Sequence, residues 1–568
     1  MAIVKFLVNV SHDERWILDT AFGEEAKARA HAQNLVKDPK NDGVRVIREK
    51  RRTDGGYDEE VLFEALKKGE KKKDVSLSEI SSAPVCDSLA DLYRAPSRGT
   101  INRLFSKYLD DAILTPTELV HSYKDLKRLL DNPLVQGAVD KVSTLQAAAT
   151  ETDARTRRDQ LSGWLDQALA RARKASERTD LPSVKAQGFA EAVGRIDASA
   201  PAEDRDFLAL VALSRELVEL RAWAAKMERV LAEMERAGPG RAMDLLDSVL
   251  ADLCGARGVV VEMIGAVPNL GGLLIRLLDL VAGRLDVTGR AETDVTVVIN
   301  RRLAAGDLPE TRAELAGQFQ RQLGSGQPLA RNEPKVEFDI FRQLLERVVT
   351  PTGVVGGFAN AEAMALRYMR FLSTGGMAGR REAIQAVTSH LPTAMQQVRF
   401  LIALSDSPVW REQLDYIIGT LESLIGKAQR MEDLVGLKGT PKTRMQEIVQ
   451  IYAFVRQTTA LPERVTSKLA EKLDALVADF LVNNQVLEKL DSPSESLRIR
   501  AVRLVQFCTS GVLTEGRAFT MARERVLTLL KQPKFDEKFV ADIPDAAARE
   551  KSLRDFHLLL ARSKFLQK

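Results

Sequence analysis

The sequence predicts a mainly α-helical protein, an irregular multi-helix bundle or array, with a small α+β module at its N-terminus. Three observations lead to this fold class. Leu and Ala, which favour helices, are abundant, whereas aromatic residues, which favour strands, make up only 5% of the 568 residues. Apolar residues after position 85 recur at helical spacing in one segment after another. The first 66 residues instead alternate apolar and polar side chains, which is typical of strands.

The N-terminal module, residues 1–66, is predicted to have the order ββαββ. The expected strands are residues 2–10, 15–22, 43–52 and 59–66, the expected helix is 23–38, and "TDGG" (53–56) forms a turn before the last strand. Part of this module, "DPKNDGVRVIRE" (38–49), matches an EF-hand loop at Asp38, Asp42, Gly43 and Glu49. Lys40 stands where an oxygen ligand belongs, so we interpret the segment as a turn from helix to strand.

Four further divisions follow from composition and breaks. Residues 67–84, with their charge, serines and closing proline, are predicted to be a solvated charged linker. The expected helical parts are a domain at 85–240, a second domain or connector at 241–330, and a C-terminal array at 331–568. No residue signature repeats at a fixed period, which favours an irregular array over a regular solenoid.

Helix signals are clearest where caps and breaks accompany the apolar spacing. In "TPTELVHSYKDLKRLLDN" (115–132), Thr115, Pro116 and Glu118 predict a capped start with a capping box. Further helices are expected at 134–175, 203–237 (ended by "GPG"), 309–323, 336–349, 359–374, 380–405, 409–431, 441–457 and 462–490. The most apolar window, 258–283, carries internal charges and Pro268, so we predict two core helices there and no membrane span.

One stretch, residues 208–234, has the apolar spacing of a coiled coil. The predicted seam, which either packs within the chain or binds a partner, comprises Leu210, Leu213, Leu217, Leu220, Trp223, Met227, Leu231 and Met234. Trp223 and Val230 widen the apolar stripe beyond the two positions of a narrow seam. A wide stripe faces several neighbouring helices, which favours packing inside the chain; an intermolecular seam is the alternative.

No motif for catalysis, cofactor binding or metal binding is found. The three cysteines, Cys86, Cys254 and Cys508, form no CxxC pair, and we expect buried or semi-buried structural thiols in a reducing compartment. The five histidines form no HExxH or HxxxH pair, and there is no GxSxG elbow. "TPTGVVGGFANAEAMALR" (350–367) is rich in glycine but lacks the Lys-Ser/Thr of a phosphate-binding loop, so we interpret it as a turn between helices.

Charge gives a second functional hypothesis. Overall the chain is close to neutral, with 83 basic and 79 acidic residues. A presumed helix around 154–178 concentrates basic residues, and the candidate phosphate contacts are Arg155, Arg157, Arg158, Arg171 and Arg173. Trp164 is the one aromatic residue among them, so no base-stacking platform is predicted.

The function that the sequence favours is that of a non-enzymatic cytoplasmic scaffold or regulatory adaptor, which binds other proteins through helical surfaces. We expect an unidentified protein partner, no cofactor, no metal and no membrane insertion, and the sequence leaves self-association open. The alternatives are a nucleic-acid-associated protein that uses the face at 155–178, and an enzyme whose site is assembled from distant residues.

Overall fold

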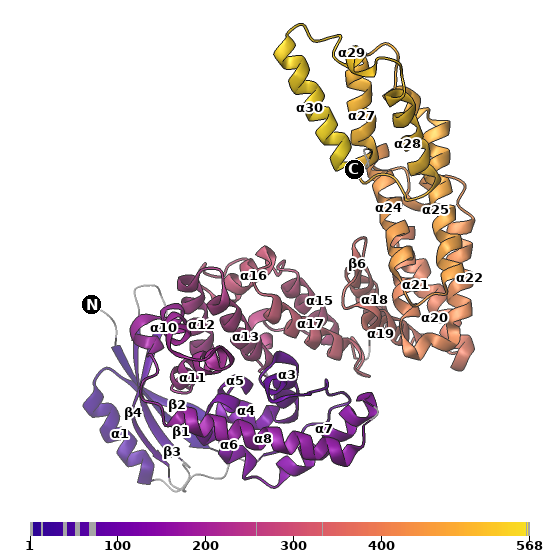
Figure 1. Cartoon of the computed structure of the whole chain (residues 1–568). Helices are drawn as coiled ribbons and strands as arrows, with labels where there is room; N and C mark the ends of the chain where they lie inside the picture. Colours follow the sequence, from indigo (N-terminus) through magenta and orange to yellow (C-terminus); the bar gives the residue numbers. More distant parts are fainter. Residues whose placement is uncertain are drawn as a thin grey trace. The chain divides into compact units, whose positions relative to one another are not determined.

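The computed structural model describes residues 4–12, 15–37, 43–51, 57–66, 75–150, 152–256, 258–331, 333–563 and 565. Within them the predicted fold class is confirmed: the protein is mainly α-helical and carries a small N-terminal α+β module (Figure 1). The chain divides into two compact units. Unit 1 contains Met1–Gln187 and Glu191–Ala222, and unit 2 contains Gly188–Ala190 and Trp223–Lys568.

The N-terminal module is a four-stranded antiparallel sheet with one helix packed against it (Figure 1, indigo). Its elements are β1 (Val4–His12), β2 (Arg15–Phe22), α1 (Glu25–Lys37), β3 (Gly43–Arg51) and β4 (Tyr57–Leu66), and the strand order is β2-β1-β3-β4. Ala28 and Ala32 of α1 are buried together with Val8, Val44 and Val46 of the sheet. The predicted ββαββ order is therefore confirmed. The EF-hand-like stretch lies partly outside the described residues, at 38–42, but β3 begins at Gly43 as the strand interpretation expects.

Residues 75–88, which we call the strap, form neither helix nor strand, yet part of their side chains are buried. Val75, Ile80, Ala83 and Cys86 belong to the main apolar core of unit 1. The predicted solvated linker is therefore wrong for residues 75–84, and residues 67–74 lie outside the described part. The apolar residues of the strap are irregularly spaced, which hid their burial from a periodicity analysis.

Short and long helices follow the strap. They are α2 (Leu89–Leu92), α3 (Ala95–Leu104), α4 (Ser106–Ala112), α5 (Pro116–His121), α6 (Tyr123–Leu130), α7 (Leu134–Thr150), α8 (Ala154–Ser176), α9 (Val184–Gln187), α10 (Phe189–Ser199), the 3-10 turn η1 (Ala202–Asp204) and α11 (Arg205–Leu217). The capping box predicted at the start of α5 is confirmed, because Glu118 N donates to Thr115 Oγ1 at 3.1 Å and Thr115 N donates to Glu118 Oε2 at 2.8 Å.

Three predicted helices in this part are interrupted. The predicted helix 115–132 breaks at Ser122, whose hydroxyl caps α6, and 134–175 breaks before Asp153, whose carboxylate caps α8. The predicted helix 203–237 ends at Leu217 and resumes at Trp223, where the two units meet in sequence. At Ser122 and at 218–222 the apolar spacing continues across the break, so periodicity alone did not reveal it, whereas Ala154 is the one apolar residue at 151–160.

The remaining elements are helical except for one short hairpin. They are α12 (Trp223–Ala237), α13 (Arg241–Gly255), α14 (Val259–Ile264), α15 (Leu270–Val281), α16 (Val295–Ala305), α17 (Pro309–Leu323), α18 (Pro334–Val348), β5 (Val349–Thr350), β6 (Gly353–Val354), α19 (Gly357–Met369), α20 (Gly376–His390), α21 (Ala394–Ser405), η2 (Pro408–Gln413), α22 (Leu414–Gly426), α23 (Glu432–Val435), α24 (Pro441–Gln457), α25 (Glu463–Asn483), α26 (Val486–Leu490), α27 (Leu497–Thr509), α28 (Arg517–Leu530), α29 (Phe535–Phe539) and α30 (Ala546–Arg562).

Several predictions for this half are confirmed and others need correction. The break near Pro268 separates α14 from α15, as expected. The β5–β6 hairpin was not expected, because two residues per strand are too few to show alternation. The segments 380–405 and 462–490 each contain two helices instead of one. Among the described residues, no helix combines the length and apolar character needed to cross a membrane.

Candidate functional site

The predicted seam does not form one helix. Leu210, Leu213 and Leu217 are buried on α11, which packs against α5 and α9 in unit 1. Met227, Leu231 and Met234 are buried on α12, which packs against α13 and α16 in unit 2. Leu220 lies in the break and Trp223 is half-buried at the start of α12. Ala224, which a continuous seam would bury, is exposed, so the eight residues are not brought onto a single stripe.

The five arginines of the predicted basic face point to two sides of α8. Arg155, Arg158 and Arg173 are exposed, but Arg158 lies within 3.6 Å of both Asp140 and Asp159, and Arg173 lies 3.5 Å from Glu177. The other two face the protein. Arg171 donates to Asp204 at 2.6 Å and its guanidinium lies 4.1 Å from the centre of the Phe207 ring. The structure therefore leaves three of the five on the exposed side, beside acidic neighbours.

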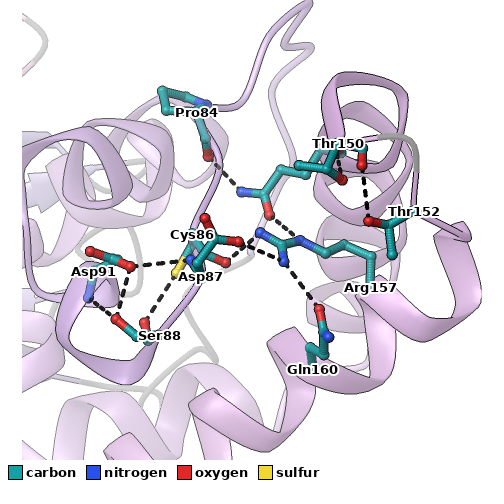
Figure 2. Close-up of polar contacts among 10 residues, drawn as sticks. Pro84, Cys86, Asp87, Ser88, Asp91, Thr150, Thr152, Arg157 and Gln160 are labelled. Atoms are coloured by element: carbon teal, nitrogen blue, oxygen red, sulfur yellow. Dashed lines mark hydrogen bonds and ion pairs between the residues drawn. The ribbon is translucent and has the colours of Figure 1, made fainter.

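Arg157, the fifth arginine, is buried and ties the strap to α7 and α8 (Figure 2). Its Nε donates to Gln146 Oε1 at 3.0 Å, and its Nη1 donates to Asp87 Oδ1 at 3.2 Å. Its Nη2 donates to the carbonyl oxygen of Cys86. Gln146 in turn donates from Nε2 to the carbonyl oxygen of Pro84 at 2.6 Å. Each of the three nitrogens of Arg157 thus already donates to an oxygen of the protein, so this arginine stabilises the irregular backbone of the strap.

Beneath the strap lies a cavity of about 100 Å³. Of the 22 residues that line it, most are apolar side chains from α3, α5, α6, α7 and α8. Four carry a hydroxyl, thiol or amide group: Cys86, Ser97, Thr100 and Gln146. The sequence did not indicate this cavity, because the residues that line it have the apolar spacing of ordinary packed helices.

A buried histidine lies in a separate aromatic cluster of unit 1. The centre of the His121 ring is 5.0 Å from that of Phe207 and 5.3 Å from that of Tyr93. His121 Nδ1 lies 2.7 Å from the carbonyl oxygen of Thr117, and Nε2 has no hydrogen-bond partner among the described residues. Burial lowers the pKa of His121 to about 3, so the ring is neutral near pH 7.

Unit 2 contains an open groove of about 760 Å³. One face of α22 lines it through Asp415, Gly419, Thr420 and Ser423, whose spacing places them together on the helix. The other lining residues are Tyr416, Leu424, Lys427, Ala428 and Asp433 from α22 onward, and Gln385, Thr388 and Gln397 from α20 and α21. Small and polar residues at helical spacing in 409–431 were the signal that could have indicated this face in the sequence.

The glycine-rich stretch at 350–367 forms the β5–β6 hairpin and the start of α19. Asn360, near the start of that helix, donates from Nδ2 to the carbonyl oxygen of Val355 at 2.7 Å. This arrangement agrees with a turn between helices. Arg399 of α21 lies beside the hairpin with its guanidinium 4.7 Å from the Phe454 ring centre.

The described part of the chain offers neither a metal-binding cluster nor an exposed thiol. No group of three His, Cys, Asp or Glu side chains there could hold a metal ion. The three cysteines are buried and free. Burial raises the pKa of Cys508 to about 11, and it also raises the pKa of Cys86 and of Cys254. Such thiols are poor nucleophiles at neutral pH.

Comparison with protein-family models, with curated proteins and with solved structures yields no match for this chain.

Proposed function

We propose that the protein is a non-enzymatic adaptor of the cytoplasm that binds an extended segment of another protein in the groove lined by α20, α21 and α22. The observation that carries the proposal is the groove itself. Its volume of about 760 Å³ lies within the range of about 300–1,000 Å³ that is usual for ligand sites. The free, buried thiols support a reducing compartment.

The chemistry of the groove suits a polypeptide backbone. The Ser423 hydroxyl and the amide of Gln385 can donate and accept hydrogen bonds. The Thr420 hydroxyl donates to the carbonyl oxygen of Tyr416 at 2.8 Å and the Gln397 amide donates to that of Leu391 at 3.0 Å, and the oxygens of both side chains can still accept. An extended peptide offers alternating N–H and C=O groups, which such side chains complement without a charged ligand. Two apolar residues, Leu424 and Ala428, provide the contact for an aliphatic side chain.

Two carboxylates give the groove a preference for basic ligands. Asp415 and Asp433 line it against a single cation, Lys427. Asp433 already accepts from the backbone N–H groups of Gln429 and Arg430, at 2.8 and 3.0 Å, so Asp415 is the carboxylate open to a ligand. We therefore expect bound segments to carry a Lys or Arg that reaches Asp415.

Gly419 permits a direct test. A Cβ added at Gly419 would meet no atom within 4 Å, so the first atom of a new side chain is accommodated without a clash. Gly419 lies inside α22, where replacing glycine stabilises the helix by up to about 1 kcal/mol. Gly419→Phe places an aromatic ring in the groove, and Gly419→Ala is the matched control that leaves most of the groove open.

The experiment selects peptides from a displayed random library on the full-length protein and measures their affinity by fluorescence anisotropy. We expect Gly419→Phe to weaken the selected peptides at least tenfold, Gly419→Ala to leave them within about twofold, and Asp415→Asn to weaken those that carry a basic residue. Circular dichroism checks that both glycine variants are folded. Peptides that bind Gly419→Phe as well as the wild type, or a selection that enriches none, would overturn the proposal.

A further inference from the structure

Arg399 of α21 is a buried cation to which the described residues supply no counter-charge. Its side chain is 8% exposed, and its guanidinium forms no hydrogen bond or ion pair with any described residue. The other buried arginines of the described chain each donate to a carbonyl oxygen; they are Arg98, Arg157 and Arg367. Buried polar groups in folded proteins almost always have partners, so the unpartnered state of Arg399 needs a reason other than chain packing.

The surroundings of Arg399 favour an anion as its partner. The guanidinium carbon lies 4.7 Å from the centre of the Phe454 ring of α24, so an aromatic ring covers one side of the charge. Burial lowers the pKa of Arg399, and no carboxylate of the described residues opposes this effect. Arginine nevertheless keeps its proton at neutral pH. A permanent positive charge therefore lies in a poorly solvated place, and an anionic ligand would compensate it.

The β5–β6 hairpin leaves room beside this guanidinium. Even a Cβ added at Gly353 would lie 3.9 Å from Arg399 Nη1, and glycine has no such atom. Arg399 Nε is fully buried without a partner, whereas Nη1 and Nη2, which also lack one, are not fully buried. Gly353 is itself half-buried. A small ligand can therefore approach the two Nη nitrogens from the solvent beside Gly353.

We propose that Arg399, beside the hairpin at Gly353, binds a carboxylate group of a small acid or of the end of a polypeptide. A guanidinium donates two parallel hydrogen bonds to the two oxygens of a carboxylate or a phosphate. One unpaired arginine balances the single charge of a carboxylate, whereas a phosphate monoester would bring a second negative charge. The site is separate from the groove, because Gln397 lines the groove and Arg399, two residues further along α21, lies on nearly the opposite side of the helix.

Saturation-transfer NMR of sodium acetate with the full-length protein, at constant ionic strength in chloride, tests this site. We expect a saturable signal from the acetate methyl group and none from acetamide, which has the same shape without the charge. Arg399→Met should abolish the acetate signal. Arg380→Met of α20 is the matched control and should leave the signal unchanged, because Arg380 also lies near an aromatic ring, that of Trp410, but already has Glu412 at 3.6 Å.

Melting curves in chloride check the folding of each variant. Arg399→Met should melt no lower than the wild type, because it removes a buried charge that the chain does not pair. N-acetylglycine, which carries a peptide group beside its carboxylate, distinguishes the two sources: binding tighter than that of acetate assigns the end of a polypeptide, and binding no tighter assigns a small acid. An acetate signal that persists in Arg399→Met, that acetamide matches, or that sulfate displaces at a lower concentration than formate does would overturn the inference. So would an Arg399→Met protein that melts well below the wild type.

Discussion

The buried histidine in unit 1 makes the stability of that unit depend on pH. His121 is 4% exposed, and burial lowers its pKa to about 3, against about 6.5 for an exposed histidine. Below pH 6.5 the unfolded chain binds a proton at His121 that the folded chain does not. The stability contributed by neutral His121 is therefore complete above about pH 6.5 and is lost as the pH falls towards 3.

The size of the effect follows from one proton per molecule. The free energy of unfolding should fall by at most about 1.4 kcal/mol per pH unit within this window. Between pH 7.5 and 4.5 the loss assigned to His121 is thus about 3 kcal/mol. His121→Phe keeps a ring against Tyr93 and Phe207 but cannot be protonated, so its stability should lack this component.

Urea unfolding of the full chain at half-unit intervals between pH 4.5 and 7.5 measures the difference. Carboxylates that titrate in the same range contribute equally to both proteins, so the wild type minus His121→Phe isolates the histidine. The expected difference is flat above pH 7 and changes steeply below 6. His31, which is partly exposed in the N-terminal module, provides the control, since His31→Phe should keep the steep change. Parallel curves for the wild type and His121→Phe would refute the reasoning.

Three further predictions concern buried arginines and thiols. Arg157→Met should lower the free energy of unfolding in urea by about 2–3 kcal/mol, because buried oxygens lose their hydrogen-bond donors. It should also speed hydrogen exchange in the strap. Unchanged exchange at 84–88 would contradict the role of Arg157 as an anchor. Arg367 of α19 donates to the carbonyl oxygens of residues 322, 323, 325 and 327. Arg367→Met should therefore lower the free energy of unfolding by about 3 kcal/mol. A loss below about 1 kcal/mol would refute this. The raised pKa values of Cys86, Cys254 and Cys508 predict that no thiol reacts with a disulfide reagent at pH 8 until the protein unfolds, and fast labelling of the native protein would disprove that.

Much of the secondary structure follows from local rules that act within a few residues. Alternation in β1 and β3, the capping box at Thr115 and Glu118, and the break near Pro268 all depend on neighbours along the chain, and each is present in the structure. Helix continuity was predicted less well. Ser122 caps a new helix while the apolar spacing continues across it, and local pattern does not separate one long helix from two short ones.

The candidate sites depended on contacts between distant residues, which the sequence alone did not determine. Arg157 resembles any exposed arginine of a basic helix, but its environment is decided by Cys86 and Asp87, about 70 positions earlier, which bring buried oxygens to its guanidinium. The seam at 208–234 divides between two units because each half packs against different helices. Composition and spacing therefore determined that the chain is mainly helical, with a small α+β module at its N-terminus. Tertiary packing alone decided which helix faces close over the cavity and which leave a groove open, because burial is a property of the whole fold.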